Sequence, residues 1–173
     1  DMTRNIPIGQ ILLNNGHIND NQLKRALQFQ KTDTDKRLGT ILVDLGYVTE
    51  RILLEAVSER VNAPLIDILD YRLNPEAAAL LPRERAEKYK VLPMDFKNET
   101  LVVATNDALA FYVFDEIQMI TGMELTIVLA EGADIEHCIQ KAYGTDAMNQ
   151  VTDHIHKAFS DEPPLEEDRA LSD

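Results

Sequence analysis

The stretch that decides the fold is RLGTILVDLGYVTE at residues 37–50, because most of its pattern occurs twice. Residues 7–20 read PIGQILLNNGHIND, with two glycines at the same spacing. The pairs Gly9 and Gly39, and Gly16 and Gly46, are each 30 positions apart, and the apolar positions around them follow the same offset. A repeated unit of this size usually means a repeated piece of structure.

Each copy is predicted to fold as a helix, a turn and a second helix. Apolar residues at helical spacing precede the second glycine of each copy, and that glycine can take the left-handed conformation that ends a helix. Asn19 and Thr49 are suitable N-caps for the second helices, and Gln22 completes a capping box with Asn19. Pro64 ends the pattern. We therefore expect residues 1–62 to form a helical subdomain of two tandem helix-turn-helix repeats.

After the repeats, short apolar runs alternate with amphipathic stretches. We expect residues 63–144 to form a small α+β subdomain with covering helices and a short, mainly antiparallel sheet of roughly four strands. The fold class predicted for the chain is thus α+β. Strands are expected at 65–69, 91–96, 101–104 and 125–129, helices at 74–81, 108–121 and 133–143, and a charged segment at 83–90. Residues 145–173 are acidic and contain prolines, which is the composition of a linker.

The net charge of −13 is unevenly distributed along the chain. Residues 1–62 hold eight acids and eight bases, residues 63–144 fourteen acids and seven bases, and residues 145–173 eight acids and two bases. Such an acidic surface repels the nucleic-acid backbone, so no nucleic-acid partner is expected. No apolar run approaches the ~20 residues of a membrane span. The lone Cys138 is expected to be a buried structural residue of a cytoplasmic protein.

The sequence holds none of the short motifs that mark common catalytic sites. There is no Gly-x-x-x-x-Gly-Lys-Ser/Thr loop to cradle phosphates, no Gly-x-Gly dinucleotide fingerprint and no Gly-x-Ser-x-Gly nucleophile elbow. No catalytic residue and no metal site are therefore predicted. The chain is not expected to be an enzyme by itself.

The tandem unit resembles the MshEN-type N-terminal domain of the hexameric secretion and pilus-extension ATPases. Residues 63–143 resemble the module that follows it in type II secretion ATPases of the E family. The residues that carry this second resemblance are Leu80-Leu81-Pro82, Ala86, Tyr89-Lys90-Val91-Leu92-Pro93, Leu101-Val102-Val103-Ala104 and Thr121-Gly122. The resemblance implies a fragment that ends before the ATPase core of a type II secretion or type IV pilus system.

The resemblance implies two roles. One is docking on the cytoplasmic domain of an inner-membrane platform protein, which would hold the protein peripherally at that membrane together with its own ATPase core. The other is binding of cyclic di-GMP across the two repeats, one half of the dinucleotide per repeat, with no other cofactor. The ligand-binding residues so implied are Ile8, Gly9, Leu12, Leu13, Gly16, Ile18, Gln30, Arg37, Leu38, Gly39, Leu42, Val43, Gly46, Val48 and Arg60.

The chain departs from the family pattern in each copy. Arg37 opens the second copy but Pro7 stands at the matching position of the first, and Gln30 ends the first copy where Arg60 ends the second. Each copy thus lacks one polar ligand, and losing a charged hydrogen bond costs roughly 1.5–3 kcal/mol. The glycines and leucines are also what a helical core needs without a ligand, so a protein–protein adaptor that binds no nucleotide is the alternative. Arg37 separates the two hypotheses, because a core does not need it.

Overall fold

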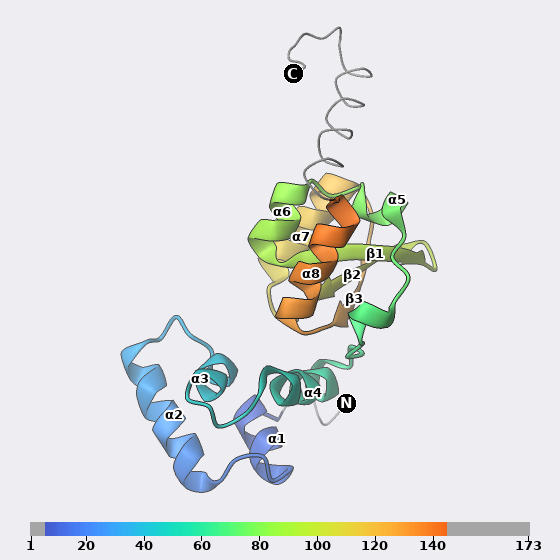
Figure 1. Ribbon diagram of the computed structural model, residues 1–173. Coiled ribbons are helices and arrows are strands. Elements are labelled where there is room, and N and C mark those ends of the chain that lie inside the picture. The colour runs from blue at the N-terminus through green and yellow to red at the C-terminus, as the bar shows by residue number, and fades with distance from the viewer. Residues whose placement is uncertain (1–5, 145–173) are drawn as a thin grey trace, which may run out of the picture.

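A computed structural model describes residues 6–144, and the linker expected at 145–173 lies outside the described residues. Two separate groups of buried side chains organise the described part. One group lies within residues 8–61, in the helices α1 to α4 and the turns between them, and the other lies within the elements that follow. Figure 1 shows the four helices at one end of the molecule, with α4 next to the α+β part.

The two repeats have the same local structure. They comprise α1 (Ile8–Asn14) with α2 (Asp20–Thr32), and α3 (Leu38–Asp44) with α4 (Glu50–Val61). The Asn19 side chain accepts the Gln22 amide and the Gln22 side chain accepts the Asn19 amide, so the predicted capping box is present. Thr49 caps α4 in the same way through the Ile52 amide, at 3.2 Å.

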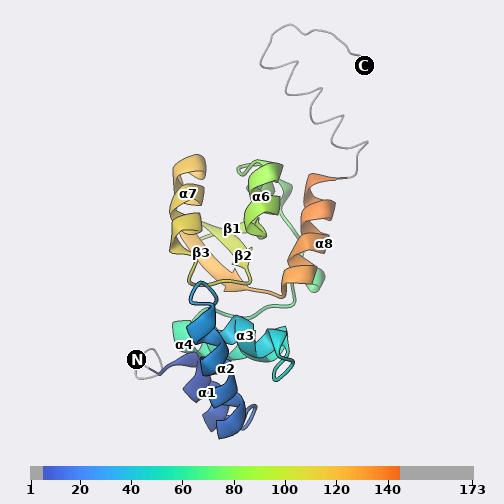
Figure 2. The same cartoon turned by 90° about the vertical axis from the view of Figure 1, so that its left-hand side faces the viewer.

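The α+β part is built around one small sheet. Its elements are the 3₁₀ turn η2 (Ile68–Asp70), α5 (Pro75–Ala78), α6 (Arg83–Tyr89), β1 (Val91–Lys97), β2 (Thr100–Thr105), α7 (Phe111–Thr121), β3 (Leu125–Leu129) and α8 (Gly132–Tyr143). The strand order is β1-β2-β3. In Figure 2, α7 and α8 lie at the two sides of this part, with α6 between them. The predicted fold class, α+β, is confirmed.

The described part of the sheet is mixed and three-stranded, which corrects the expected sheet of roughly four mainly antiparallel strands. β1 and β2 form the expected antiparallel hairpin, from Val91 opposite Thr105 to Lys97 opposite Thr100. β2 and β3 are parallel, from Leu101 opposite Leu125 onwards. The reason is the connection between them, because a helical crossover such as α7 returns the chain in the direction of the previous strand.

The strand expected at 65–69 is wrong. Leu65 makes a single bridge to Leu129, and the Ile66 amide donates to the Leu129 carbonyl at 2.8 Å. The ladder then stops, because η2 turns the chain away and the Asp70 amide donates to the Asp67 carbonyl at 3.1 Å.

One helix was not predicted, and two predicted helices have different bounds. The charged segment expected at 83–90 is the helix α6, supported by an Arg83–Glu87 ion pair at i, i+4 and ended by Lys90 with a φ of 54°. The helix expected at 74–81 is only the short α5, since its last turn gives way to Pro82, the N-cap of α6. The helix expected from 108 begins at Phe111, with Ala110 as its N-cap.

Candidate functional site

The two repeats pack side by side around one core, as their equivalence in sequence suggests. That core combines Ile11, Leu12, Ile18 and Ala26 of the first repeat with Ile41, Leu42, Val48 and Ala56 of the second. α1 contacts both α3 and α4, so neither repeat buries its apolar face alone. Any ligand that touches both copies therefore meets a single continuous helical unit.

Four of the apolar residues implied as ligand contacts belong to this core. Leu12 and Leu42 are completely buried, and Ile18 and Val48 are buried as well. Their side chains pack in the shared core, so their contact with a ligand stays a prediction of the hypothesis. Its remaining apolar candidates are the half-buried residues Ile8, Leu13, Leu38 and Val43.

The four glycines of the repeats fall into two kinds. Gly9 and Gly39 are buried, and a Cβ there would lie 2.8 Å from Leu23 Cδ1 or 2.6 Å from Leu53 Cδ1, so these positions are small because the helices pack closely. Gly16 and Gly46 are exposed, with φ angles of 80° and 79°.

Each exposed glycine ends its helix with a matching pair of hydrogen bonds. The His17 amide donates to the Leu12 carbonyl at 2.9 Å and the Gly16 amide to the Leu13 carbonyl at 3.1 Å, and the second repeat has the equivalent pair. This is a Schellman motif, which needs the left-handed conformation that glycine adopts without strain. The turns thus have a structural reason that does not depend on a ligand.

The polar candidates lie at different places. Arg37, the N-cap residue of α3, forms an ion pair with Asp107 of the α+β part, and its side chain is 49% exposed. Gln30 donates through Nε2 to the Lys36 carbonyl at 3.3 Å, so it faces the connector between the repeats. Arg60 lines a hollow of about 470 Å³ together with Ala108 and Leu109. Both arginines therefore lie near the segment that begins at Asp107, and Gln30 lies beside Arg37 through its bond to the Lys36 carbonyl.

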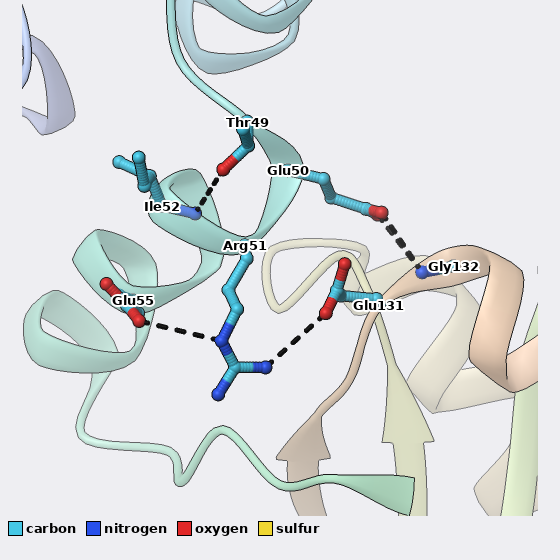
Figure 3. A network of polar contacts seen from close by, with 7 residues as sticks. All are labelled: Thr49, Glu50, Arg51, Ile52, Glu55, Glu131 and Gly132. Carbon is cyan, nitrogen blue, oxygen red and sulfur yellow. Dashed lines mark hydrogen bonds and ion pairs between the residues drawn. The ribbon is translucent and has the colours of Figure 1, made fainter. Parts of the chain in front are cut away.

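Further polar contacts link α4 to the ends of the sheet strands. Glu50 Oε2 accepts the Gly132 amide at 3.1 Å and Asn106 Nδ2 at 3.0 Å, as Figure 3 shows for Gly132. Arg51 pairs with Glu131 at 3.4 Å. The Glu50 carboxylate thus lies at the N-terminus of the twelve-residue helix α8, where the helix dipole favours a negative charge.

Sequence reasoning missed the acids and amides of this junction. Asn106 and Asp107 follow β2, and Glu131 and Gly132 follow β3, so they meet at the carboxyl ends of two parallel strands. That edge is where ligands of parallel sheets commonly bind. Here it receives side chains of the repeats. The meeting of these two loops was not predicted, because an antiparallel pairing of the two strands would not place the loops at the same edge of the sheet.

Three further predictions concern the thiol of Cys138, metal binding and membrane-spanning helices. Cys138 is buried, as predicted, and burial raises the pKa of its thiol, so it does not favour the nucleophilic thiolate. Within residues 6–144, no group of three or more His, Cys, Asp or Glu side chains is placed to hold a metal ion. None of the helices in that range is long and apolar enough to span a bilayer.

Comparison with known proteins finds relatives among the type IV pilus assembly ATPases. The chain is 29% identical to the type IV pilus assembly ATPase PilB of Myxococcus xanthus over 154 residues, and 30% identical to PilB of Thermus thermophilus over 118 residues. These alignments cover 86% and 67% of this chain, but the chain spans only 27% and 13% of the length of those relatives.

Two solved structures have a similar fold. The structure of MshE with cdg covers 80% of this chain and 99% of its own, with a TM-score of 0.72 and 25% identity. The N-terminal domain of XpsE covers 83% of this chain and 96% of its own, with a TM-score of 0.63 and 23% identity, and supports the fold alone.

The family model of the MshEN domain matches residues 61–149. The match thus begins where the repeats end, on the part expected to resemble the module that follows such a domain, whereas the likeness to MshE extends over more of the chain. Since these 89 residues are slightly more than half of 173, the protein belongs to the MshEN domain family.

Proposed function

We propose that this chain is a non-catalytic regulatory and docking part of a type II secretion or type IV pilus assembly ATPase, and that its tandem repeats bind cyclic di-GMP. Two similarities support the proposal. The relatives PilB are type IV pilus assembly ATPases by name, and MshE was solved with cdg, which we take to be cyclic di-GMP. The residues of this chain add a further reason.

The observation that carries the proposal is the position of Arg37. Its guanidinium lies outside the shared core of the repeats and is half exposed, so packing of that core does not require it. A guanidinium pairs in bidentate fashion with phosphate or with the edge of guanine. An arginine at the start of a repeat is therefore suited to bind one half of a guanine dinucleotide.

The proposed site is narrower than the set of residues implied by the resemblance. Around Arg37 it uses the half-buried Ile8, Leu13, Leu38 and Val43 as apolar surface, the open turns at Gly16 and Gly46 as places of close approach, and Gln30 and Arg60 as polar contacts. The other implied residues, Gly9, Leu12, Ile18, Gly39, Leu42 and Val48, support the site by packing.

Isothermal titration of the 173-residue chain with cyclic di-GMP tests this role. We expect saturable heat with one dinucleotide per chain at submillimolar ligand, because one missing polar ligand per copy weakens the site without removing it. Cyclic di-AMP is the matched control and should bind more weakly, since adenine lacks the O6 acceptor that an arginine reads on guanine. Absence of heat with cyclic di-GMP in this range would end the sensing proposal.

A specific surface favours the alternative, docking without nucleotide. α7 exposes Phe111, Tyr112 and Met119, which are 63%, 71% and 85% exposed, and Asp115 lies on the same face of the helix. The sequence from 98 to 140 contains eight acids and neither lysine nor arginine. An apolar helix face within acidic surroundings fits a partner segment that carries apolar anchors beside basic side chains.

We therefore propose that the cytoplasmic domain of the inner-membrane platform protein docks on this face of α7. Docking there would hold the chain peripherally at the inner membrane, next to its own ATPase core. The two roles can be tested separately, because Arg37 belongs to the repeats and the docking face belongs to α7.

Replacing both Tyr112 and Met119 with serine should weaken retention of the platform domain about tenfold, since the partner then buries less apolar surface. Binding is measured by surface plasmon resonance with the platform domain immobilised. The matched control replaces Leu27 and Phe29, exposed apolar residues of α2, with serine. Equal affinity of the two double variants would exclude α7 as the docking face, and raised salt should weaken binding if the acidic surround takes part.

A further inference from the structure

Arg37, the residue on which the proposed nucleotide site depends most, is already paired with an acid of the α+β part. Asp107 Oδ1 accepts from Arg37 Nη1 and also from the Leu109 amide, at 3.1 Å for the latter. The Asp107 amide in turn donates to Thr105 Oγ1 at 3.0 Å. The carboxylate is thus fixed by its own loop at the end of β2, and the arginine reaches it from the repeats.

Further side-chain hydrogen bonds and ion pairs cross this junction. Glu50 accepts the amides of Gly132 and Asn106, and Arg51 pairs with Glu131. The buried clusters of the two parts remain separate. Parts that keep separate cores are expected to move relative to one another unless a large apolar interface joins them. The angle between the repeats and the sheet is therefore set by few and replaceable contacts.

We propose that cyclic di-GMP and Asp107 compete for Arg37, so that binding of the dinucleotide opens the Arg37–Asp107 contact and loosens the repeats from the α+β part. The proposal rests on the nucleotide-binding function proposed above. Competition follows from the geometry of the guanidinium, because the donors that grip a phosphate or a guanine edge are the same donors that hold a carboxylate. Ligand binding in the repeats would thereby change their contact with the α+β part.

The contact is weak enough to be displaced. The Arg37 and Asp107 side chains are 49% and 41% exposed, and exposed ion pairs contribute little to stability because water and salt screen them. The affinity of the dinucleotide is reduced by the fraction of molecules in which Arg37 is occupied. For a pair of this kind that factor is about two- to fivefold. Because the two partners exclude each other at Arg37, saturating dinucleotide removes the contact.

Replacing Asp107 with asparagine tests the competition. The amide keeps an oxygen for the Leu109 amide but removes the charge that holds Arg37, so cyclic di-GMP should bind about two- to fivefold more tightly by isothermal titration. Glu131→Gln is the matched control, because it makes the same chemical change in another ion pair of this junction without touching Arg37. Its affinity should equal that of the wild type.

A second variant and a second measurement keep the test decisive if asparagine disturbs the loop. Asp107→Ser retains a short oxygen acceptor for the turn and also lacks the charge. Spin labels at Lys24→Cys and Glu84→Cys, exposed positions of α2 and α6, report the distance between the two parts, and the buried Cys138 is not expected to react. Cyclic di-GMP should shift or broaden the distance distribution of the labelled wild type. The labelled Asp107→Asn protein should already show that distribution without ligand.

The outcomes separate the two proposals. No heat with the wild type would overturn both. Binding that is lost in Arg37→Ala but unchanged in Asp107→Asn and Asp107→Ser would overturn the competition and leave the nucleotide site standing. Equal tightening by Asp107→Asn and Glu131→Gln would also overturn it, since general loosening of the junction would then be the cause. A distance distribution that ligand does not alter would contradict the opening of the contact.

Discussion

Replacing Leu42 with alanine should lower the free energy of unfolding of the repeats by about 2–5 kcal/mol, the range for large-to-small changes in a packed core. Leu42 is completely buried and lies in the cluster that both repeats build together, where Leu12 is its counterpart. The loss includes the transfer of the side chain to water and the cavity left behind. Such a loss is a large part of the free energy of unfolding of an ordinary domain.

Urea unfolding followed by circular dichroism measures this effect. Leu27→Ala is the matched control, because Leu27 is 41% exposed on α2 of the same unit, and its replacement should stay within about 0.5 kcal/mol. Equal losses for the two variants would mean that the repeats do not share the core described above.

The same experiment tests whether the two buried clusters are independent. Tyr47 belongs to the repeats, whereas Tyr71, Tyr89, Tyr112 and Tyr143 belong to the α+β part, and the chain has no tryptophan. Tyrosine fluorescence therefore reports mainly on the second cluster. In Leu42→Ala we expect the helical signal to be lost at lower urea while the fluorescence transition moves less. Coincident shifts in both signals would indicate one cooperative unit instead.

Replacing Arg37 with alanine should weaken binding of cyclic di-GMP about ten- to a hundredfold. The change removes a charged hydrogen-bonding group worth roughly 1.5–3 kcal/mol, and each 1.4 kcal/mol corresponds to about a factor of ten. Loss of the Arg37–Asp107 contact would by itself raise the apparent affinity slightly, so a large net loss can come only from direct contact with the ligand. Arg37→Lys should recover part of the loss, because it keeps the charge without the planar fork.

Arg51→Ala is the control that matches this substitution most closely. Its side chain is 51% exposed and also pairs with an acid of the α+β part, but it lies on α4 rather than at the start of a repeat. We expect wild-type affinity for this variant. If Arg37→Ala binds like Arg51→Ala, the adaptor function without nucleotide becomes the better account of the chain.

The helical repeats could be predicted from the sequence almost completely. Their signals are local: a fixed offset, glycines at positions that must be left-handed, and capping residues such as Asn19 and Thr49 that act on their own helices. Local signals do not depend on knowledge of the tertiary structure. For the same reason the positions of α8 and of the hairpin β1–β2 were close to their expected bounds.

The features that could not be predicted are those set by distant parts of the chain. The segment 65–69 has the composition of a strand, yet its pairing stops after the one bridge at Leu65 because the chain turns at Asp67. The parallel pairing of β2 with β3 depends on how α7 crosses the sheet, and periodicity does not specify this crossing. The charged residues of α6 gave no apolar period, although the Arg83–Glu87 spacing was a helical signal.

For the candidate site as well, local features could be predicted and long-range contacts could not. Sequence alone indicated which residues of the repeats differ from what a core needs, and Arg37 is such a residue. It did not show that Leu12 and Leu42 are completely buried in the shared core, because core leucines and ligand-facing leucines have the same spacing on a helix. Nor did it reveal Asp107 as the partner of Arg37, since the two residues are 70 positions apart in the chain.

Mapping of cyclic di-GMP onto the protein by two-dimensional ¹H–¹⁵N NMR tests the central claim most directly. We predict shifts that saturate with ligand and cluster in both repeats, at the turns of Gly16 and Gly46 and at the Arg37 side chain, with a further shift at Asp107 as its contact opens. Shifts confined to the α+β part, or none at saturating ligand concentrations, would contradict the account.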